Sequence, residues 1–193
     1  PFAEAGAHVI PTDFSLGMLR VGHQRQPSLP FVAGDGERLP FKDDSFDRYL
    51  SFETIEHVPD PKAMLLEARR VLRPGGMLLL STPNRTLTNP GKTLDDRPFN
   101  RYHLREWTAE EFQKMLTAVF GQVELYVQSP FSTRYARWLN RLGRVWPALG
   151  VRTHQATKVL LTLLKRFPSC DVQPPKADTV GEVSLAVAFR TAT

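Results

Sequence analysis

An apolar strand that directly follows an amphipathic helix constrains this chain more than any other feature. Met77–Leu80 opens a strand that we expect to reach Thr82, and its continuous apolar run predicts burial on both faces of a sheet. The preceding helix is capped by Asp60, carries Pro61 in its first turn, and is ended by residues 73–76 (Arg-Pro-Gly-Gly). This order of elements predicts an α/β fold.

The same alternation of strands and helices extends along most of the chain. A helix from Ser15 to about Gly22 and a helix opened by Thr108 separate short apolar runs. Thr108 and Glu111 have the spacing of a capping box, and Trp107 and Phe112 have the spacing of a hydrophobic staple. We expect further strands at residues 7–12, 30–33, 46–52, 121–127 and 182–190. Together they predict a doubly wound, mostly parallel sheet with helices on both faces.

Length and composition restrict the class of protein. A chain of 193 residues with 41% hydrophobic residues can form one domain with a substantial core. Cys170 is the only cysteine, so the chain has no internal disulfide and a reducing compartment is favoured. No apolar stretch approaches the roughly 20 residues of a membrane span, and no leader opens the chain. We therefore expect a cytoplasmic protein.

Basic residues gather in one segment near the C-terminus. Residues 131–170 contain eight Arg or Lys and no Asp or Glu, whereas the rest of the chain is slightly acidic. We expect a helical insert over residues 131–179, with helices at 135–145 and 157–167, beside a core formed by 1–130 and 180–193. Because the charge is local, we do not expect a nucleic-acid-binding protein. Residues 131–167 can form a peripheral membrane contact. In the slightly favoured alternative, the leucines of this segment pack on the sheet and its arginines are solvated. The arginines at helical spacing are Arg134, Arg137, Arg141 and Arg144.

Polar residues follow three of the expected strands, where ligands bind in open parallel sheets. Asp13 can accept both hydroxyls of a ribose, or it can complement a helix dipole. Asp35, flanked by glycines, can accept from an exocyclic amine, or it can belong to an ordinary turn. Glu53, Glu56 and His57 can hold a cation, but a solvated helix start is the favoured interpretation, so we expect no metal.

Four motifs in order resemble the class I S-adenosylmethionine-dependent methyltransferases. They are AHVIPTDFSLGML, GDGERLPFKDDSFD, ETIEHVPDP and EARRVLRPGGMLLLSTPN, and the resemblance covers residues 6–84. It implies a Rossmann-like fold with S-adenosylmethionine as cofactor. RYHLREWTAEEF resembles a subset of methyltransferase type 11 members that act on small molecules, glycans and lipid-linked acceptors. The ExxEH pattern of Glu53, Glu56 and His57 resembles the ubiquinone-pathway O-methyltransferases.

The resemblance also implies roles for individual residues. Asp13 would hold the cofactor ribose, and Asp35 the adenine amino group with Gly36 beside it. The implied apolar cofactor contacts are Phe14, Met18 and Phe52. The reaction would be direct methyl transfer, governed mainly by alignment, to a hydroxyl whose proton is taken by a base. The base candidates are His57 and His103.

One part of the family pattern is absent from this sequence. The family's first strand and its glycine-rich loop would precede Asp13, where too few residues stand. We expect a chain truncated at its N-terminus, with weak cofactor binding and a sheet that lacks its central strand. A degenerate domain that binds a partner through its basic insert remains an alternative function. A nicotinamide-dependent oxidoreductase has no support beyond Asp13.

Overall fold

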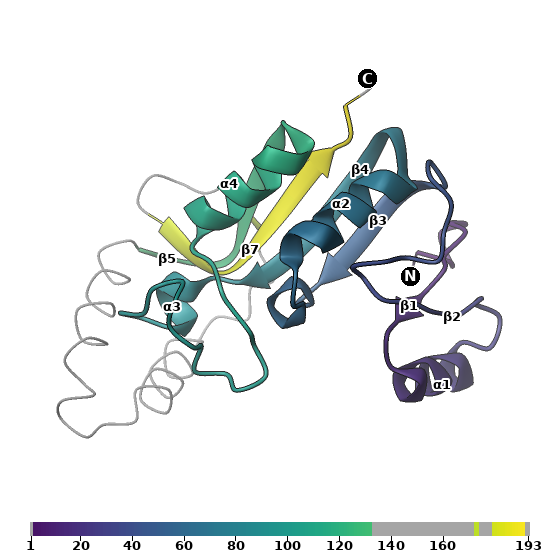
Figure 1. The fold of residues 1–193 in the computed structure, drawn as a ribbon, viewed down its shortest axis with the longest axis horizontal. Coiled ribbons are helices and arrows are strands. Elements are labelled where there is room, and N and C mark those ends of the chain that lie inside the picture. Colours follow the sequence, from purple (N-terminus) through teal and green to yellow (C-terminus); the bar gives the residue numbers. More distant parts are fainter. Residues whose placement is uncertain (1, 133–171, 174–178, 192–193) are drawn as a thin grey trace.

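The computed structural model describes residues 2–132, 172–173 and 179–191 (Figure 1). Its elements form a five-stranded sheet, a separate two-stranded sheet and helices that connect them. In chain order they are β1 (Thr12–Asp13), α1 (Leu16–Arg25), β2 (Val32–Ala33), β3 (Phe46–Phe52), the 3₁₀ helix η1 (Ile55–His57), α2 (Pro61–Val71), β4 (Leu72–Pro83), α3 (Arg85–Thr88), α4 (Ala109–Phe120), β5 (Val123–Ser132), β6 (Val172–Gln173) and β7 (Thr179–Phe189).

The large sheet has the strand order β3-β4-β7-β5-β6. β3 pairs with β4 in parallel, whereas β7 lies between β4 and β5 and is antiparallel to both. β3, β4 and β5 therefore run in the same direction, and β7 is the long strand that is reversed. The Rossmann-like α/β fold expected from the sequence is confirmed, with β7 and the two-residue β6 running antiparallel to the other strands.

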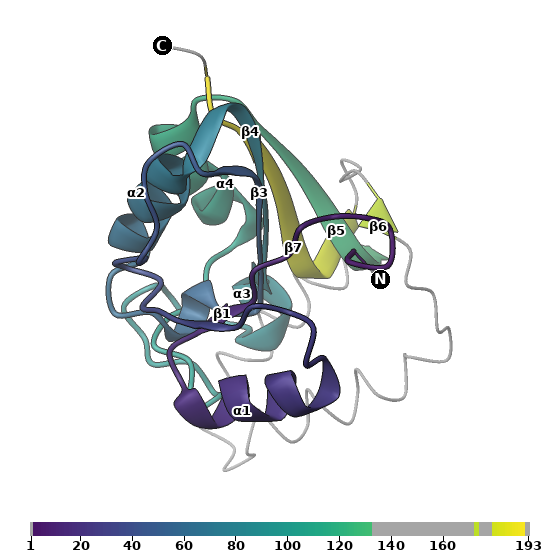
Figure 2. The same ribbon diagram turned by 90° about the vertical axis from the view of Figure 1, so that its right-hand side faces the viewer.

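Helices α2 and α4 cover one face of this sheet (Figure 2). The core between them consists of fully buried apolar side chains, including Leu65, Leu78, Leu80, Phe112 and Ala186. Two helices of this kind bury their apolar stripes against the sheet, which removes a large apolar area from water.

The opposite face of the sheet departs from the expectation of helices on both sides. Among the described residues, no helix lies on that face (Figure 2). Its apolar side chains are consequently open to solvent, with Leu50 exposed to 38%, Phe52 to 49% and Phe189 to 40%. The described part of the chain therefore forms a layer of helices on one face only.

The first strand is shorter than expected and is not buried. The sequence predicted a buried strand at residues 7–12, but β1 spans Thr12 and Asp13, both of which are exposed. β1 pairs only with β2, over two residues in parallel, and Ile10 is 37% exposed. The carbonyl of Pro11 accepts from the N–H of Val32 at 3.0 Å, so pairing with this short neighbour begins only at residue 11 and does not extend to residues 7–10.

β1, α1 and β2 form a lobe beside the edge of β3, and hydrogen bonds to α2 hold it there (Figure 1). Glu37 Oε1 accepts from the backbone N–H of Asp60 at 2.8 Å, and Glu67 Oε2 accepts from that of Leu39 at 2.9 Å. Arg70 donates to the carbonyls of Leu39 and Phe41, at 3.2 and 2.8 Å. The segment after β2 is thus attached to α2 through paired polar groups.

Most of the other expected elements are found, with shifted boundaries, but the strand expected at residues 30–33 is reduced to β2, Val32–Ala33. β3 spans Phe46–Phe52 as predicted, and α2 begins at Pro61 with Asp60 Oδ1 accepting from the N–H groups of residues 62 and 63. β4 begins at Leu72, five residues earlier than expected. α1 continues to Arg25 rather than Gly22. The helices expected at 135–145 and 157–167, and the arginines among them, lie outside the described residues.

No helix in the described part of the chain combines the length and the apolar character that a membrane span requires.

The N-terminus of α4 gives a direct test of local stability. Thr108 Oγ1 accepts from the N–H of Glu111 at 3.3 Å, and Glu111 Oε2 accepts from the N–H of Thr108 at 2.8 Å, so the expected capping box is confirmed. Thr108→Ala should lower the free energy of unfolding by about 1 kcal/mol, measured by urea titration. Thr117→Ala, on the exposed surface of the same helix, is the matched control and should lower it by less. Equal losses in both variants would show that the cap contributes nothing specific.

Candidate functional site

Asp13 and Asp35 lie at the carboxyl ends of two adjacent parallel strands. β1 and β2 pair through Asp13 and Ala33, and the N–H of Gly34 donates to the carbonyl of Asp13 at 3.1 Å. Asp13 Oδ1 also accepts from the N–H of Ser15 at 2.7 Å, and Asp35 Oδ1 accepts from that of Glu37 at 2.9 Å. Both carboxylates are exposed, and each is oriented by a bond to its own loop.

Gly34 is the residue that lets these two strand ends come together. A Cβ atom at this position would lie 2.9 Å from Thr12 Cγ2 and 2.9 Å from Pro40 Cδ, closer than real contacts permit. Only glycine fits here, and its close approach fixes Asp35 beside β1. At Gly36 a Cβ atom would meet Met64 Cγ at 3.7 Å, an ordinary contact distance.

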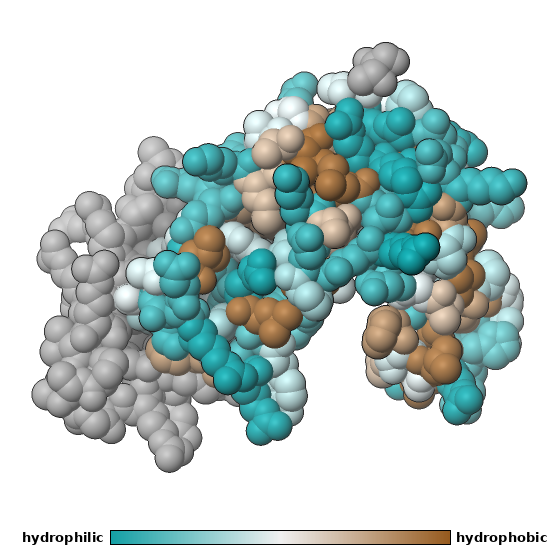
Figure 3. Space-filling view, in the orientation of Figure 1, coloured by the Kyte–Doolittle hydropathy of each residue, from teal (hydrophilic) through white to brown (hydrophobic). Residues whose placement is uncertain are grey.

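The apolar residues expected to contact the cofactor are open to solvent. Phe14 is 80% exposed, Met18 60% and Phe52 49%. Figure 3 shows hydrophobic residues on the lobe that carries α1, beside a notch that separates this lobe from the body of the molecule. Such large exposed apolar side chains are typical of a surface that a ligand covers.

The turn after β3 carries the acidic residues of the ExxEH pattern. Glu53 has a positive φ of 50°, which is uncommon for a residue with a side chain. Its N–H donates to Ser81 O at 3.2 Å, and Ser81 Oγ donates to Glu53 Oε1 at 2.8 Å. Burial raises the pKa of Glu53, and the hydrogen bond from Ser81 opposes this effect. Glu53 is therefore directed to β4.

Glu56 is a carboxylic acid in the interior, with a side chain that is 1% exposed. Oε2 accepts from Thr82 Oγ1 at 3.1 Å, but Oε1 is buried and has no hydrogen-bond partner. Burial raises the pKa of Glu56, because the charged form loses its hydration. A buried oxygen without a partner is costly, and it points to a missing donor or cation.

His57 is oriented by the backbone of a distant loop. Its Nδ1 lies 2.9 Å from the carbonyl oxygen of Tyr102, which can only accept, so Nδ1 carries the proton. In the neutral imidazole, Nε2 then bears the lone pair, 3.9 Å from Glu56 Oε1. The side chain of His57 is 43% exposed, whereas that of Glu56 is buried.

His103 has the same orientation through a buried carboxylate. Its Nδ1 lies 2.5 Å from Glu106 Oε1, so Nδ1 carries the proton and Nε2 bears the lone pair. Nε2 lies 2.7 Å from Asn100 Nδ2. The side chains of His103 and Glu106 are only 11% and 2% exposed.

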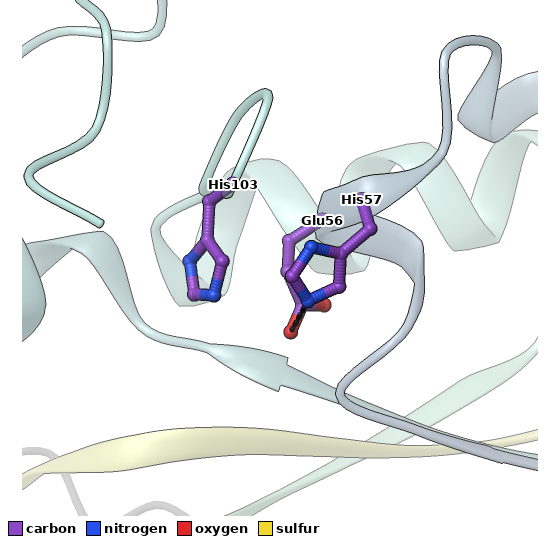
Figure 4. Close-up of side chains that lie close together, drawn as sticks. All are labelled: Glu56, His57 and His103. Atoms are coloured by element: carbon purple, nitrogen blue, oxygen red, sulfur yellow. Dashed lines mark ion pairs between the residues drawn. The ribbon is translucent and has the colours of Figure 1, made fainter. Parts of the chain in front are cut away.

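The structure brings together Glu56, His57 and His103 (Figure 4). One oxygen of Glu56 and one ring nitrogen of each histidine lie within 4.8 Å of one another. The two imidazole rings meet edge to face, with centroids 4.8 Å apart. Of the three residues considered from the sequence as cation ligands, Glu53 does not join this group, and His103 takes its place.

Several residues of this site escaped the sequence analysis. Glu106 accepts from His103, from Asn89 Nδ2 at 2.5 Å and from Thr88 Oγ1. Thr82 supports Glu56, and the N–H of Leu104 donates to the carbonyl of Glu56 at 2.8 Å. The three-residue spacing of His103 and Glu106 is a signal that the sequence did contain.

A cleft of about 460 Å³ lies elsewhere, between the start of α2, the loop before α4 and α4 itself. Its lining includes Asp60, Leu94, Leu104, Trp107 and Met115. None of the residues expected to bind the cofactor or to act as a base lines it. The candidate site is therefore the surface around the strand ends rather than this cleft.

Comparison with known proteins shows that the chain is similar to methyltransferases. Residues 1–80 match the model of a methyltransferase domain. The chain is 45% identical over 94 residues to a demethylmenaquinone methyltransferase of Streptomyces griseus, an alignment that covers 49% of this chain and 41% of that protein. It is 35% identical over 150 residues to one of Paenarthrobacter aurescens, covering 74% and 56%. The chain thus spans about half the length of these relatives, or less.

Solved structures share the fold. A S-adenosylmethionine-dependent methyltransferase of Thermotoga maritima superposes with a TM-score of 0.64 at 18% identity, covering 98% of this chain and 76% of that one. A phosphoethanolamine N-methyltransferase of Haemonchus contortus, in complex with S-adenosyl-L-methionine, gives 0.58 at 17% identity, covering 99% and 45%. These structures show the fold, and together with the domain match over residues 1–80 they support a class I S-adenosylmethionine-dependent methyltransferase, as the motifs indicated.

The buried carboxylate of Glu106 can be tested through stability. Glu106→Gln keeps the shape of the side chain but replaces a charged acceptor that takes bonds from three side chains. Because hydrogen bonds to charged groups contribute more than neutral ones, the free energy of unfolding should fall by roughly 1.5–3 kcal/mol. Glu110→Gln, exposed in the first turn of α4, is the control and should change it by less than about 0.5 kcal/mol. A loss no larger than that of the control would contradict the role of Glu106.

Proposed function

We propose that the protein transfers the sulfonium methyl group of S-adenosylmethionine to a hydroxyl group of a small acceptor molecule. The observation that carries the proposal is the position of Asp13, Asp35 and His57. Asp13 ends β1, Asp35 follows β2, and His57 lies in η1, the turn that follows β3. Ligands bind at the carboxyl ends of strands in open α/β sheets. The methyltransferase relatives support methyl transfer from S-adenosylmethionine, though not the hydroxyl acceptor in particular, and they disfavour a degenerate domain that only binds a partner.

The cofactor half of the proposed site lies on the β1–β2 lobe. Asp13 would accept from the ribose hydroxyls, and Asp35 from the adenine amino group, with Gly36 allowing close approach. The adenosine would cover Phe14 and Met18, and Phe52 would contact the methionine part. The exposure of these three apolar side chains supports the assignment, since a bound ligand would remove their surface from water.

The acceptor half lies on the turn after β3 and the loop before α4. The demethylmenaquinone methyltransferases among the relatives suggest a menaquinone-type acceptor, and no observation favours a glycan. The acceptor hydroxyl would lose its proton at the group formed by Glu56, His57 and His103. Its oxygen would then attack the methyl carbon, and the C–S bond would break to release S-adenosylhomocysteine.

Within that group, His57 is better placed than His103 to receive the proton. The side chain of His57 is 43% exposed, whereas that of His103 is 11% exposed and its Nε2 already faces the amide of Asn100. Contact with a membrane surface, which a lipid-linked acceptor would favour, remains part of this proposal. The segment considered for it, residues 131–167, lies largely outside the described residues.

The cofactor assignment predicts the effect of two substitutions. Asp13→Ala and Asp35→Ala should each weaken S-adenosylmethionine binding, because each removes an acceptor worth roughly 1–3 kcal/mol, or about 5- to 150-fold in affinity. Calorimetric titration of the purified protein with S-adenosylmethionine measures the affinity. Asp47→Ala, which removes an exposed carboxylate paired with Arg73, is the matched control. Unchanged affinity in both aspartate variants would place the cofactor elsewhere.

The proton-transfer assignment predicts a separate effect on turnover. His57→Ala should lower kcat by roughly 10²–10⁴-fold and leave S-adenosylmethionine affinity nearly unchanged. His103→Ala, tested alone, should lower kcat less, since its ring nitrogens are already engaged. Turnover can be followed as S-adenosylhomocysteine release with a quinol acceptor. Full activity of both variants would show that neither histidine acts as a base and that catalysis depends only on the alignment of the cofactor and the acceptor.

A further inference from the structure

We propose that Glu56, His57 and His103 form a binding site for a divalent transition-metal ion such as Zn²⁺. The site deepens the proposed function, on which its catalytic meaning rests, but the binding itself is argued from the geometry of these three side chains. Two imidazoles and one carboxylate are a ligand set that suits Zn²⁺ or Fe²⁺. The set differs from the ExxEH residues, because one ligand comes from a loop 46 residues further along the chain.

The orientation of both histidines supports the site. Histidine ligands generally donate their second N–H to a carboxylate or to a backbone carbonyl, which fixes the ring and makes the other nitrogen a better ligand. Here His103 donates Nδ1–H to Glu106, and His57 donates Nδ1–H to the carbonyl of Tyr102. Both rings therefore keep Nε2 unprotonated, as a metal ligand requires, although Nε2 of His103 now accepts from the amide of Asn100 at 2.7 Å.

The unpaired oxygen of Glu56 is the second, independent observation. Oε1 is buried without a hydrogen-bond partner, while Oε2 is held by Thr82. It lies 3.9 Å from His57 Nε2. A cation bound between these atoms would supply the missing charge, which explains why an acidic oxygen is left unpaired in the interior.

The distances require only a small closure around an ion. Zn–N and Zn–O distances of about 2.0–2.2 Å place tetrahedral ligands roughly 3.3–3.5 Å apart. The ligand atoms here lie within 4.8 Å of one another, so shifts on the order of 1 Å would complete the coordination. Asn100, whose amide now faces His103 Nε2, would turn away from it, and a solvent molecule or the acceptor would take the open position on the His57 side.

A metal ion at this place would refine the proposed mechanism. A hydroxyl bound to a dication loses its proton more readily, because the metal lowers the pKa of the coordinated oxygen. The nitrogen of His57 would then hold the ion, and the proton of the acceptor hydroxyl would pass to solvent water. Mg²⁺ and Ca²⁺ prefer oxygen ligands and would bind poorly to two imidazoles.

The test is calorimetric titration of chelator-treated protein with ZnCl₂, in a Cys170→Ser background that removes the only thiol. One equivalent should bind. His57→Ala, His103→Ala and Glu56→Gln should each weaken zinc binding by more than tenfold, and Glu106→Gln by roughly 10–100-fold. Glu53→Gln removes a nearby charge but no ligand and should weaken zinc binding less than the three ligand substitutions. His23→Ala, on the exposed surface, should leave zinc affinity unchanged. MgCl₂ should give no comparable binding.

Two readouts keep the outcome clear if a variant fails to fold. Co²⁺ bound to the unaltered protein should give visible ligand-field absorption, and Zn²⁺ should raise its melting temperature by mass action. Absence of both effects, or stoichiometric zinc binding that survives all three ligand substitutions, would overturn the proposal. Zinc binding without methyl transfer would contradict the proposed function alone, whereas methyl transfer without zinc binding would contradict the metal site alone.

Discussion

The carboxylate of Glu106 supports the loop that carries half of the candidate site. It accepts from His103 in the loop, and from Thr88 and Asn89 at the end of α3, so it joins residues that are far apart in the chain. An ionised carboxylate in the interior is stable only when donors surround it, and this requirement fixes the positions of all three donors. The loop in turn binds η1, through Tyr102 to His57 and through Leu104 to Glu56.

The rest of the site depends on how the small lobe meets the body of the molecule. Asp13 and Asp35 lie on the β1–β2 sheet, which shares no strand pairing with β3. The connection instead comes from polar contacts with α2, made by Glu37 and by Glu67 with Arg70. The hydrogen bond between Arg70 and Glu67 lowers the pKa of Glu67, so that carboxylate remains charged at neutral pH. The two halves of the proposed site therefore sit on units that are joined mainly by hydrogen bonds.

Local signals in the sequence predicted the elements that depend on local chemistry. β3, the Asp60 cap of α2 and the Thr108–Glu111 box follow from residues near one another in the chain, and the structure contains all three. The prediction of a buried strand at residues 7–12 was wrong. A strand also needs neighbouring strands to pair with, and a local sequence pattern does not reveal whether they are present. The grouping of His103 with Glu56 and His57, and the support from Glu106, depend on a loop that returns to η1. Spacing in the sequence could suggest Glu53 as their companion but could not show that Glu53 bonds to Ser81 instead.

The central claim is that S-adenosylmethionine binds on the face of the small lobe that carries Asp13 and Met18. Nuclear magnetic resonance of protein labelled with [methyl-¹³C]methionine tests it directly, since the chain has four methionines. Met18 is 60% exposed on α1, whereas Met115 lies on α4, away from that lobe. On titration with S-adenosylmethionine, the Met18 methyl signal should shift until it saturates, and the Met115 signal should stay in place. A saturating shift at Met115 with Met18 unchanged would contradict the account.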